Sequence, residues 1–215
     1  MGMLAVCATT EAEPVRVLIL SGQNNHAWQE TTPVLRGILE ESGRFAVEVT
    51  DQPQTITAES VKDLDVILSN WNGWDDAAVK EWPEAARTAL MDFVRGGKGF
   101  VSVHAGTSSF YDWPEYQELA IASWKIGETG HGKRHAFSVK LTPEDHPITR
   151  GTLPFETFDE LWHAVPIQPG AKVLATAFSS KDSNGSGNDE PMLMVRDFGK
   201  GRSVNLLLGH DVQAM

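Results

Sequence analysis

Apolar runs that suit buried strands alternate with helical patterns through the first half of the chain. The four runs are Val15–Leu20, Phe45–Thr50, Asp65–Ser69 and Gly99–His104. Strands that alternate with helices form parallel βαβ units, whose sheet is covered by helices on both faces. The alternation therefore predicts a three-layer α/β fold on a doubly wound, mainly parallel sheet.

Two of the intervening segments carry helix-start signals. Thr32 followed by Pro33 predicts an N-cap and a first-turn proline. Pro83 opens a second segment, in which apolar residues recur at helical spacing until Gly96-Gly97. We expect both segments to form helices that pack on the sheet.

The second half of the chain changes rhythm. Shorter strand-like runs with few helical patterns between them cover His135–Leu141, Lys172–Phe178, Pro191–Asp197 and Ser203–Leu208. These runs predict antiparallel additions to the sheet. The segment Ser179–Asp189, which is rich in Ser, Gly, Asn and Asp, is expected to be an exposed, mobile loop.

Composition limits the classes of function. The chain has 215 residues, 41% of them hydrophobic, which suits one domain over residues 15–215. A formal net charge of -11, without a Lys/Arg-rich run, argues against nucleic acid and membrane surfaces as partners. Cys7 is the only cysteine and lies in the leading segment, which argues against thiol catalysis.

Both ends of the sequence invite a prediction. Residues 1–14 are interpreted either as the remainder of a secretory signal or as an ordinary disordered start. In the first case we expect a periplasmic or secreted protein, and in the second a cytoplasmic one. The chain stops a few residues after a strand, where a doubly wound sheet usually adds a helix. This predicts a truncated C-terminus.

Three of the seven histidines directly follow predicted strand ends. They are His26, His104 and His210. In parallel sheets, ligands bind outside the carboxyl ends of the strands, so we expect the three side chains to line one pocket. Any one of them alone is better explained by a structural hydrogen bond, but the trio suits acid–base catalysis or a divalent metal. No compact ligand motif is present, so the metal remains an open possibility.

Aromatic and amide side chains lie in the same predicted loops. Trp28, Asn70 and Trp71 are candidates for sugar binding, because indole faces suit the C–H faces of sugar rings and amides suit hydroxyl groups. The alternative is that these indoles fill the core beneath the loops. Sugar contact is given less weight for three other tryptophans, namely Trp82, Trp124 and Trp162.

Carboxylates that could orient or activate water complete the candidate site. Asp159, Glu160 and Asp211 are the best placed. The acidic pairs Glu40-Glu41 and Glu144-Asp145 are interpreted as solvated surface.

A set of motifs, in order from about residue 15 to the end, resembles the ThuA-like (trehalose-utilisation) family. The motifs are the strand-one loop with His26, Phe93–Ala105, Asp145–Thr149, Phe158–Trp162, Gly199–Ser203 and Leu208–Asp211. The resemblance implies a class I glutamine-amidotransferase-like, flavodoxin-like fold. It also implies work on trehalose, related disaccharides or keto-sugars.

By this resemblance, the recurrent family positions are His26, His104, Asp159, Glu160, His210 and Asp211, with His131 matching a further family histidine. The chain departs from the family where relatives carry a tryptophan after the proline matching Pro191, and in lacking the closing helix. It also has His104 in the region where amidotransferases carry their cysteine, which excludes thiol-dependent glutamine hydrolysis.

Two hypotheses remain open at this point. In the first, the protein is a hydrolase or lyase of a small carbohydrate, in which His104 or His210 activates water and Asp211 or Glu160 orients it. We then expect substitution of His104 by Ala to abolish turnover with little change in melting temperature. In the second, the protein is a non-catalytic sugar-binding or regulatory domain. The sugar, the metal and the oligomeric state are not determined by the sequence.

Overall fold

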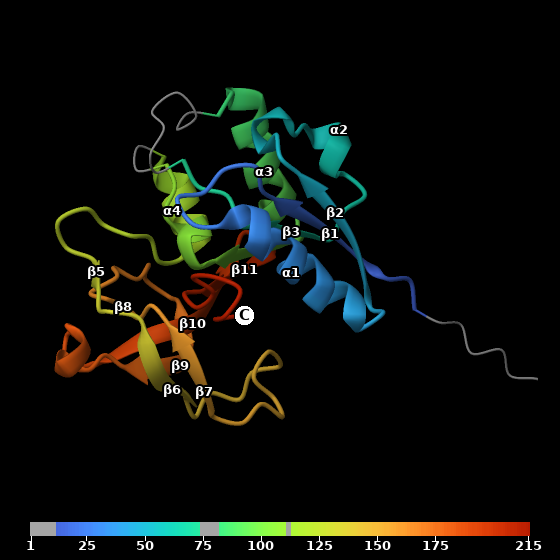
Figure 1. Ribbon diagram of the computed structural model, residues 1–215. Helices are drawn as coiled ribbons and strands as arrows, with labels where there is room; N and C mark the ends of the chain where they lie inside the picture. Colours follow the sequence, from blue (N-terminus) through green and yellow to red (C-terminus); the bar gives the residue numbers. More distant parts are fainter. Residues whose placement is uncertain (1–11, 74–81, 111–112) are drawn as a thin grey trace, which may run out of the picture.

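The computed structural model describes residues 12–73, 82–110 and 113–215, and a sheet of nine strands runs through them (Figure 1). The strand order is β2-β1-β3-β4-β11-β10-β9-β6-β7. Five strands form the parallel half: β1 (Val15–Leu20), β2 (Phe45–Thr50), β3 (Val66–Ser69), β4 (Gly99–Val103) and β11 (Gly201–Leu206). The predicted α/β fold with a doubly wound sheet is confirmed.

The other half of the sheet is antiparallel, as predicted for the runs His135–Leu141, Lys172–Phe178 and Pro191–Asp197. The run Ser203–Leu208 differs from the prediction, because β11 pairs antiparallel with β10 on one side but parallel with β4 on the other. β10 turns back into β11 as a hairpin, and each further strand pairs antiparallel with its neighbour. These strands are β6 (His135–Leu141), β7 (Phe155–Asp159), β9 (Lys172–Phe178) and β10 (Asp189–Phe198). Because β10 reverses the chain, β11 runs parallel to β4, and both strands end at the same edge of the sheet.

Helices cover both faces of the parallel half. The helical elements are α1 (Trp28–Glu41), η1 (Pro53–Thr55), α2 (Ala58–Val61), α3 (Glu84–Arg95), η3 (His104–Thr107), α4 (Pro114–Ala120) and η4 (Lys181–Ser183). On one face, Leu35 of α1 packs with Val17 and Ile19 of β1. On the other face, the apolar side of α3 packs with Leu18 and Leu20. Alternate side chains along β1 thus pack into two separate cores, one on each face of the sheet.

Helix α1 begins earlier than the sequence signals suggested. Thr32 does not cap the helix, and Pro33 lies inside it, because the helix already starts at Trp28. The Thr32 hydroxyl instead accepts a hydrogen bond from Asn70 Nδ2 at 2.9 Å and lies 2.7 Å from the Ser21 hydroxyl. The Thr32 side chain, which was expected to cap the helix, therefore contacts the residues that follow β1 and β3.

The expectation that Ser179–Asp189 is exposed is wrong at Ser179. Its side chain is buried and its Oγ accepts a hydrogen bond from the backbone N–H of Ser186. The Ser186 hydroxyl in turn donates to Glu190 Oε1 at 2.6 Å, and Lys133 N–H donates to the carbonyl of Ser183 at 2.7 Å. Polar residues here build a hydrogen-bonded turn that includes η4, rather than a loop without contacts.

A second, small sheet lies beside the large one. It pairs β5 (Gly130–His131) antiparallel with β8 (Trp162–His163), and His131 lies directly opposite Trp162. Of the expected leader over residues 1–14, residues 1–11 lie outside the described part of the chain. Within the described part, no helix is both long and apolar enough to cross a bilayer.

Candidate functional site

The structure brings the three histidines of the strand-end loops together. The ring centroids of His26 and His104 are 4.8 Å apart, those of His26 and His210 are 4.5 Å apart, and those of His104 and His210 are 5.4 Å apart. All three pairs of rings are close to perpendicular. The parallel direction of β1, β4 and β11 explains the convergence, because each histidine follows the carboxyl end of one of these strands.

Glu160 adds a carboxylate to the histidine cluster. Its Oε2 lies 3.4 Å from Nδ1 of His210 and 3.3 Å from Nδ1 of His131, and its Oε1 lies 3.8 Å from Nε2 of His104. Oε1 also accepts a hydrogen bond of 2.8 Å from the indole N–H of Trp162. The side chain is almost fully buried, so these neighbours, rather than bulk water, determine its surroundings.

His104 stands at a strained turn after β4. Its φ of +44° is rare for a residue with a Cβ, and strain of this kind concentrates at functional sites. Nδ1 donates to the carbonyl oxygen of Leu207 at 2.8 Å, which leaves the lone pair of the neutral ring on Nε2. Burial, followed by the nearby His26 ring, holds the pKa of His104 well below its usual value. The imidazole is therefore neutral at physiological pH.

His26 is held by the loop that carries it. Its Nδ1 lies 3.2 Å from Oδ1 of Asn24 and 3.1 Å from Oδ1 of Asn25. Desolvation is the largest cause that lowers the pKa of His26 to about 4, and the neighbouring His210 adds to the effect. This ring too is neutral at physiological pH.

Asp159 is buried beside the cluster and does not line the pocket. Its carboxylate is fully buried and accepts backbone N–H groups of Gly209, His210 and Glu160 at 2.7, 3.2 and 2.7 Å. Burial raises the pKa of Asp159, although these hydrogen bonds oppose the shift. Its oxygen atoms thus hold the backbone beside two cluster residues, which indicates a positioning role instead of the expected direct contact with substrate.

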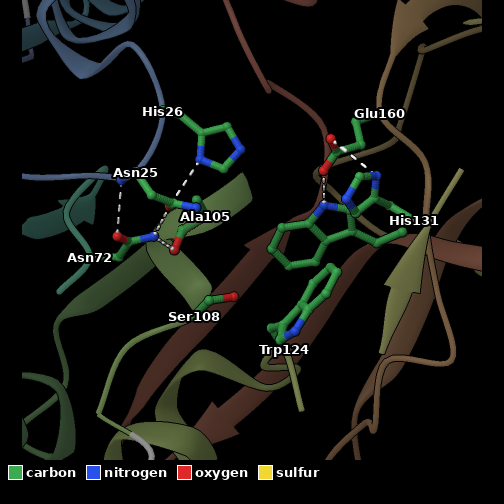
Figure 2. A pocket seen from close by; sticks show the side chains of 9 residues that line it. Asn25, His26, Asn72, Ala105, Ser108, Trp124, His131 and Glu160 are labelled. Carbon is green, nitrogen blue, oxygen red and sulfur yellow. Dashed lines mark hydrogen bonds and ion pairs between the residues drawn. The ribbon is translucent and has the colours of Figure 1, made fainter. Parts of the chain in front are cut away.

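A pocket of about 240 Å³ opens beside the cluster. Figure 2 shows Asn25 and Asn72 on the His26 side, and Glu160 with His131 on the opposite side. Trp124 and Trp162 also line the pocket and supply aromatic surface. The pocket is smaller than the roughly 300–1,000 Å³ of sites for drug-sized ligands, so it suits a single small ring or fragment.

Two of the expected binding residues lie elsewhere. Trp71 is buried in the core, where it stacks on Phe110 with ring centroids 5.2 Å apart, and it does not line the pocket. Asn70 is also buried, and its Nδ2 donates to the hydroxyls of Thr31 and Thr32. Trp71 therefore fills the core and Asn70 anchors α1, and neither of the two expected sugar-binding residues lines the pocket.

Three further predicted residues differ in their relation to the pocket. Trp28 starts α1, is half-buried and is not part of the pocket wall. Asp211 forms an ion pair of 2.7 Å with Arg134, and its charge acts on the pKa of His26. His131, by contrast, lines the pocket directly.

Part of the pocket wall is formed by residues that the sequence did not single out. Trp124 and Trp162 line the pocket, although they received less weight than Trp28 and Trp71. Asn72 follows the same strand as Asn70, and its Nδ2 donates to the carbonyl of Ala105 at 3.0 Å. The position of Trp162 two residues after Glu160 was a usable signal, whereas nothing local to Trp124 indicates that it reaches the site.

Four side chains could together hold a metal ion. One ligand atom from each of His26, His104, Glu160 and His210 lies within 4.8 Å of all the others. Imidazole nitrogen and carboxylate oxygen are ligands of divalent transition metals.

Comparisons with solved structures reveal close relatives in fold. A ThuA-like protein from Parabacteroides merdae ATCC 43184 is 29% identical, with a TM-score of 0.80, over 92% of this chain and 80% of that chain. A ThuA-like protein from Bacteroides uniformis ATCC 8492 is 18% identical, with a TM-score of 0.71, over 98% and 89% of the two chains. A glutamine amidotransferase from Thermotoga maritima shares the fold at 14% identity and a TM-score of 0.55, over 91% and 76%.

The search of curated proteins found no match. The family model for ThuA, described as trehalose utilisation, matches residues 16–215, which is nearly the whole sequence. This agrees with the order of motifs along the chain and suggests a role related to carbohydrate metabolism. The chain belongs to the ThuA family.

Proposed function

We propose that this protein is an enzyme that cleaves a disaccharide, a glycoside or a keto-sugar by hydrolysis or elimination. The observation that carries the proposal is the position of Glu160. Its carboxylate lies within 3.3–3.8 Å of three imidazoles and forms part of the wall of a small pocket. The family's association with trehalose utilisation supports the class of substrate.

Glu160 is suited to accept a proton from water or from the substrate. The Trp162 indole N–H fixes Oε1, while Oε2 faces the ring of His131. The His131 side chain is 46% exposed and connects the carboxylate to solvent. In the proposed reaction, Glu160 takes the proton and returns it to the leaving group or to bulk water, a type of general base catalysis that contributes roughly 10²–10⁴-fold to rates.

The pocket wall has the composition of a site for one sugar ring. The indoles of Trp124 and Trp162 offer flat apolar surface, and Asn25, Asn72 and Ser108 offer polar groups for hydroxyls. The volume of about 240 Å³ leaves room for one ring, so the second half of a disaccharide would extend toward solvent.

The test is turnover of a panel of disaccharides, simple glycosides and their keto derivatives, with products detected by mass spectrometry. Glu160→Gln should lower kcat at least about 100-fold on the substrate found, in line with loss of a general base. Glu144→Gln is the matched control, because Glu144 is exposed and lies outside the pocket, and it should keep wild-type kcat.

The second candidate is a non-catalytic sugar-binding domain, which the aromatic wall of the pocket would also suit. It predicts that a sugar binds without being converted. It also predicts that the turnover rate of Glu160→Gln equals that of wild type on every substrate tested. Either result would refute the enzymatic proposal.

A further inference from the structure

The outward-facing nitrogens of two cluster histidines are already occupied. Nδ1 of His104 donates to the carbonyl of Leu207, and Nδ1 of His26 is held by the amide oxygens of Asn24 and Asn25. Metal-binding histidines nearly always use their second nitrogen in this way, since the bond fixes the tautomer and orients the ring. In both residues the arrangement leaves Nε2 as the nitrogen with the free lone pair.

Two inward-facing nitrogens form no hydrogen bond, although the Glu160 carboxylate lies 3.4–3.8 Å from them. Among the residues that the structure describes, neither Nε2 of His104 nor Nδ1 of His210 forms a hydrogen bond, and both atoms are buried. The His104 side chain is only 3% exposed. Buried polar atoms rarely lack a hydrogen bond, so a buried nitrogen without one that faces other ligand atoms calls for an explanation.

We propose that His26, His104 and His210 bind one divalent transition-metal ion through their imidazole nitrogens. Ligand atoms from these three residues and Glu160 all lie within 4.8 Å of one another. Two nitrogens that bind one Zn²⁺ at about 2.0–2.1 Å lie roughly 3.4 Å apart, so ligand atoms at the 4.8 Å limit must approach one another by about 1.4 Å. His26 and His210 are only partly buried and can make this adjustment.

Glu160 stands next to the three nitrogens and offsets the charge of the ion. Its oxygens lie 3.4 Å from Nδ1 of His210 and 3.8 Å from Nε2 of His104. A site with three protein ligands and an adjacent carboxylate has the composition of catalytic rather than closed structural metal sites. Three imidazoles favour ions of the Zn²⁺, Co²⁺ and Ni²⁺ class over Mg²⁺ and Ca²⁺, which prefer all-oxygen sites.

The experiment measures metal binding directly and needs no substrate. Full-length protein stripped with a chelator is titrated with Co²⁺, whose visible absorption reports nitrogen coordination, and then with Zn²⁺ as a competitor; Mg²⁺ serves as the negative ion. We expect one Co²⁺ per chain, displaced by Zn²⁺. His26→Gln and His210→Gln should each weaken binding more than 100-fold, and Glu160→Gln should weaken it about 10-fold, as expected for a neighbouring group.

His146→Gln is the matched control, because His146 lies outside the cluster and should leave Co²⁺ affinity unchanged. Circular dichroism and melting temperature establish that each variant is folded. The proposal is overturned if the folded wild type shows no Co²⁺ absorption at millimolar metal, or if His26→Gln and His210→Gln bind as tightly as wild type. Metal binding without turnover of any sugar would instead count against the proposed function alone.

Discussion

His104 and Leu207 are joined by a hydrogen bond of 2.8 Å between the ring Nδ1 and the backbone carbonyl, across 103 positions of sequence. The bond ties the turn after β4 to the end of β11. It fixes which nitrogen of His104 faces the pocket, and it makes the ring part of the packing between the two strand ends. The same hydrogen bond therefore affects both the orientation of the His104 ring at the pocket and the stability of the protein.

The first prediction concerns His104→Ala. The substitution leaves the Leu207 carbonyl without its partner and opens a cavity, so we expect a loss of about 1–3 kcal/mol in the free energy of unfolding. This replaces the expectation from sequence that the melting temperature would hardly change. Urea denaturation followed by circular dichroism measures the change. A loss below about 0.5 kcal/mol would show that the ring is not part of the packing.

The second prediction concerns Asp159→Asn. Three backbone N–H groups donate to the Asp159 carboxylate. An amide keeps one acceptor oxygen but places an NH₂ group, which cannot accept, against some of these donors. We expect a loss of about 1–3 kcal/mol in the free energy of unfolding, and weaker Co²⁺ binding because the backbone of His210 is no longer held. Asp145→Asn on an exposed loop is the control and should change neither quantity.

The third prediction separates two tryptophans. Trp71→Ala should lower the free energy of unfolding by about 3–5 kcal/mol, because the ring is buried and stacked in the core. Trp124→Ala should instead raise KM for the sugar substrate, with a smaller loss of stability, because this half-buried ring forms part of the pocket wall. Unfolding and steady-state kinetics on both variants test the assignment, and the reverse pattern would contradict it.

The fourth prediction concerns acid stability at Asp65, which lies away from the pocket. The hydrogen bond from the backbone N–H of Arg16 and that from Lys98 hold the pKa of Asp65 below its usual value of 3.8. A lowered pKa in the folded state stabilises the protein above about pH 3.8, and the contribution is lost as the pH falls through the folded-state pKa.

Asp65→Asn should therefore be less stable than wild type at pH 7, by no more than about 1 kcal/mol because the groups are exposed. The difference between the two proteins should shrink as the pH falls below 3.8. Urea unfolding at a series of pH values measures it, and a difference that grows on acidification would contradict the assignment.

The sequence predicted the sheet and the meeting of the three histidines for the same reason. Both depend on the direction of the strands. A continuous apolar run that ends at a definite residue indicates a buried strand such as β1 and shows where it ends. His26, His104 and His210 each follow such an end, so their convergence is a consequence of topology.

The assignment of individual side chains could not be predicted in this way. Trp71 and Trp124 both lie near loops, but which one fills the core depends on partners distant in sequence, such as Phe110 for Trp71. Thr32 has the local pattern of a helix cap, yet a contact to Asn70 uses its hydroxyl. Local patterns cannot show which of two competing hydrogen bonds forms when one partner is about forty residues away.

The pairing of β11 with β4 has a consequence for the newly made protein. Arg202 lies opposite Gly99 in this pair, and His210 follows directly after the strand. On the ribosome, the early strands emerge and can pair long before β11 exists, so the edge of β4 must wait with its hydrogen-bonding groups unpaired. Closing that edge and completing the histidine cluster therefore both wait for the last residues of the chain, and a chain interrupted during translation before residue 201 can do neither.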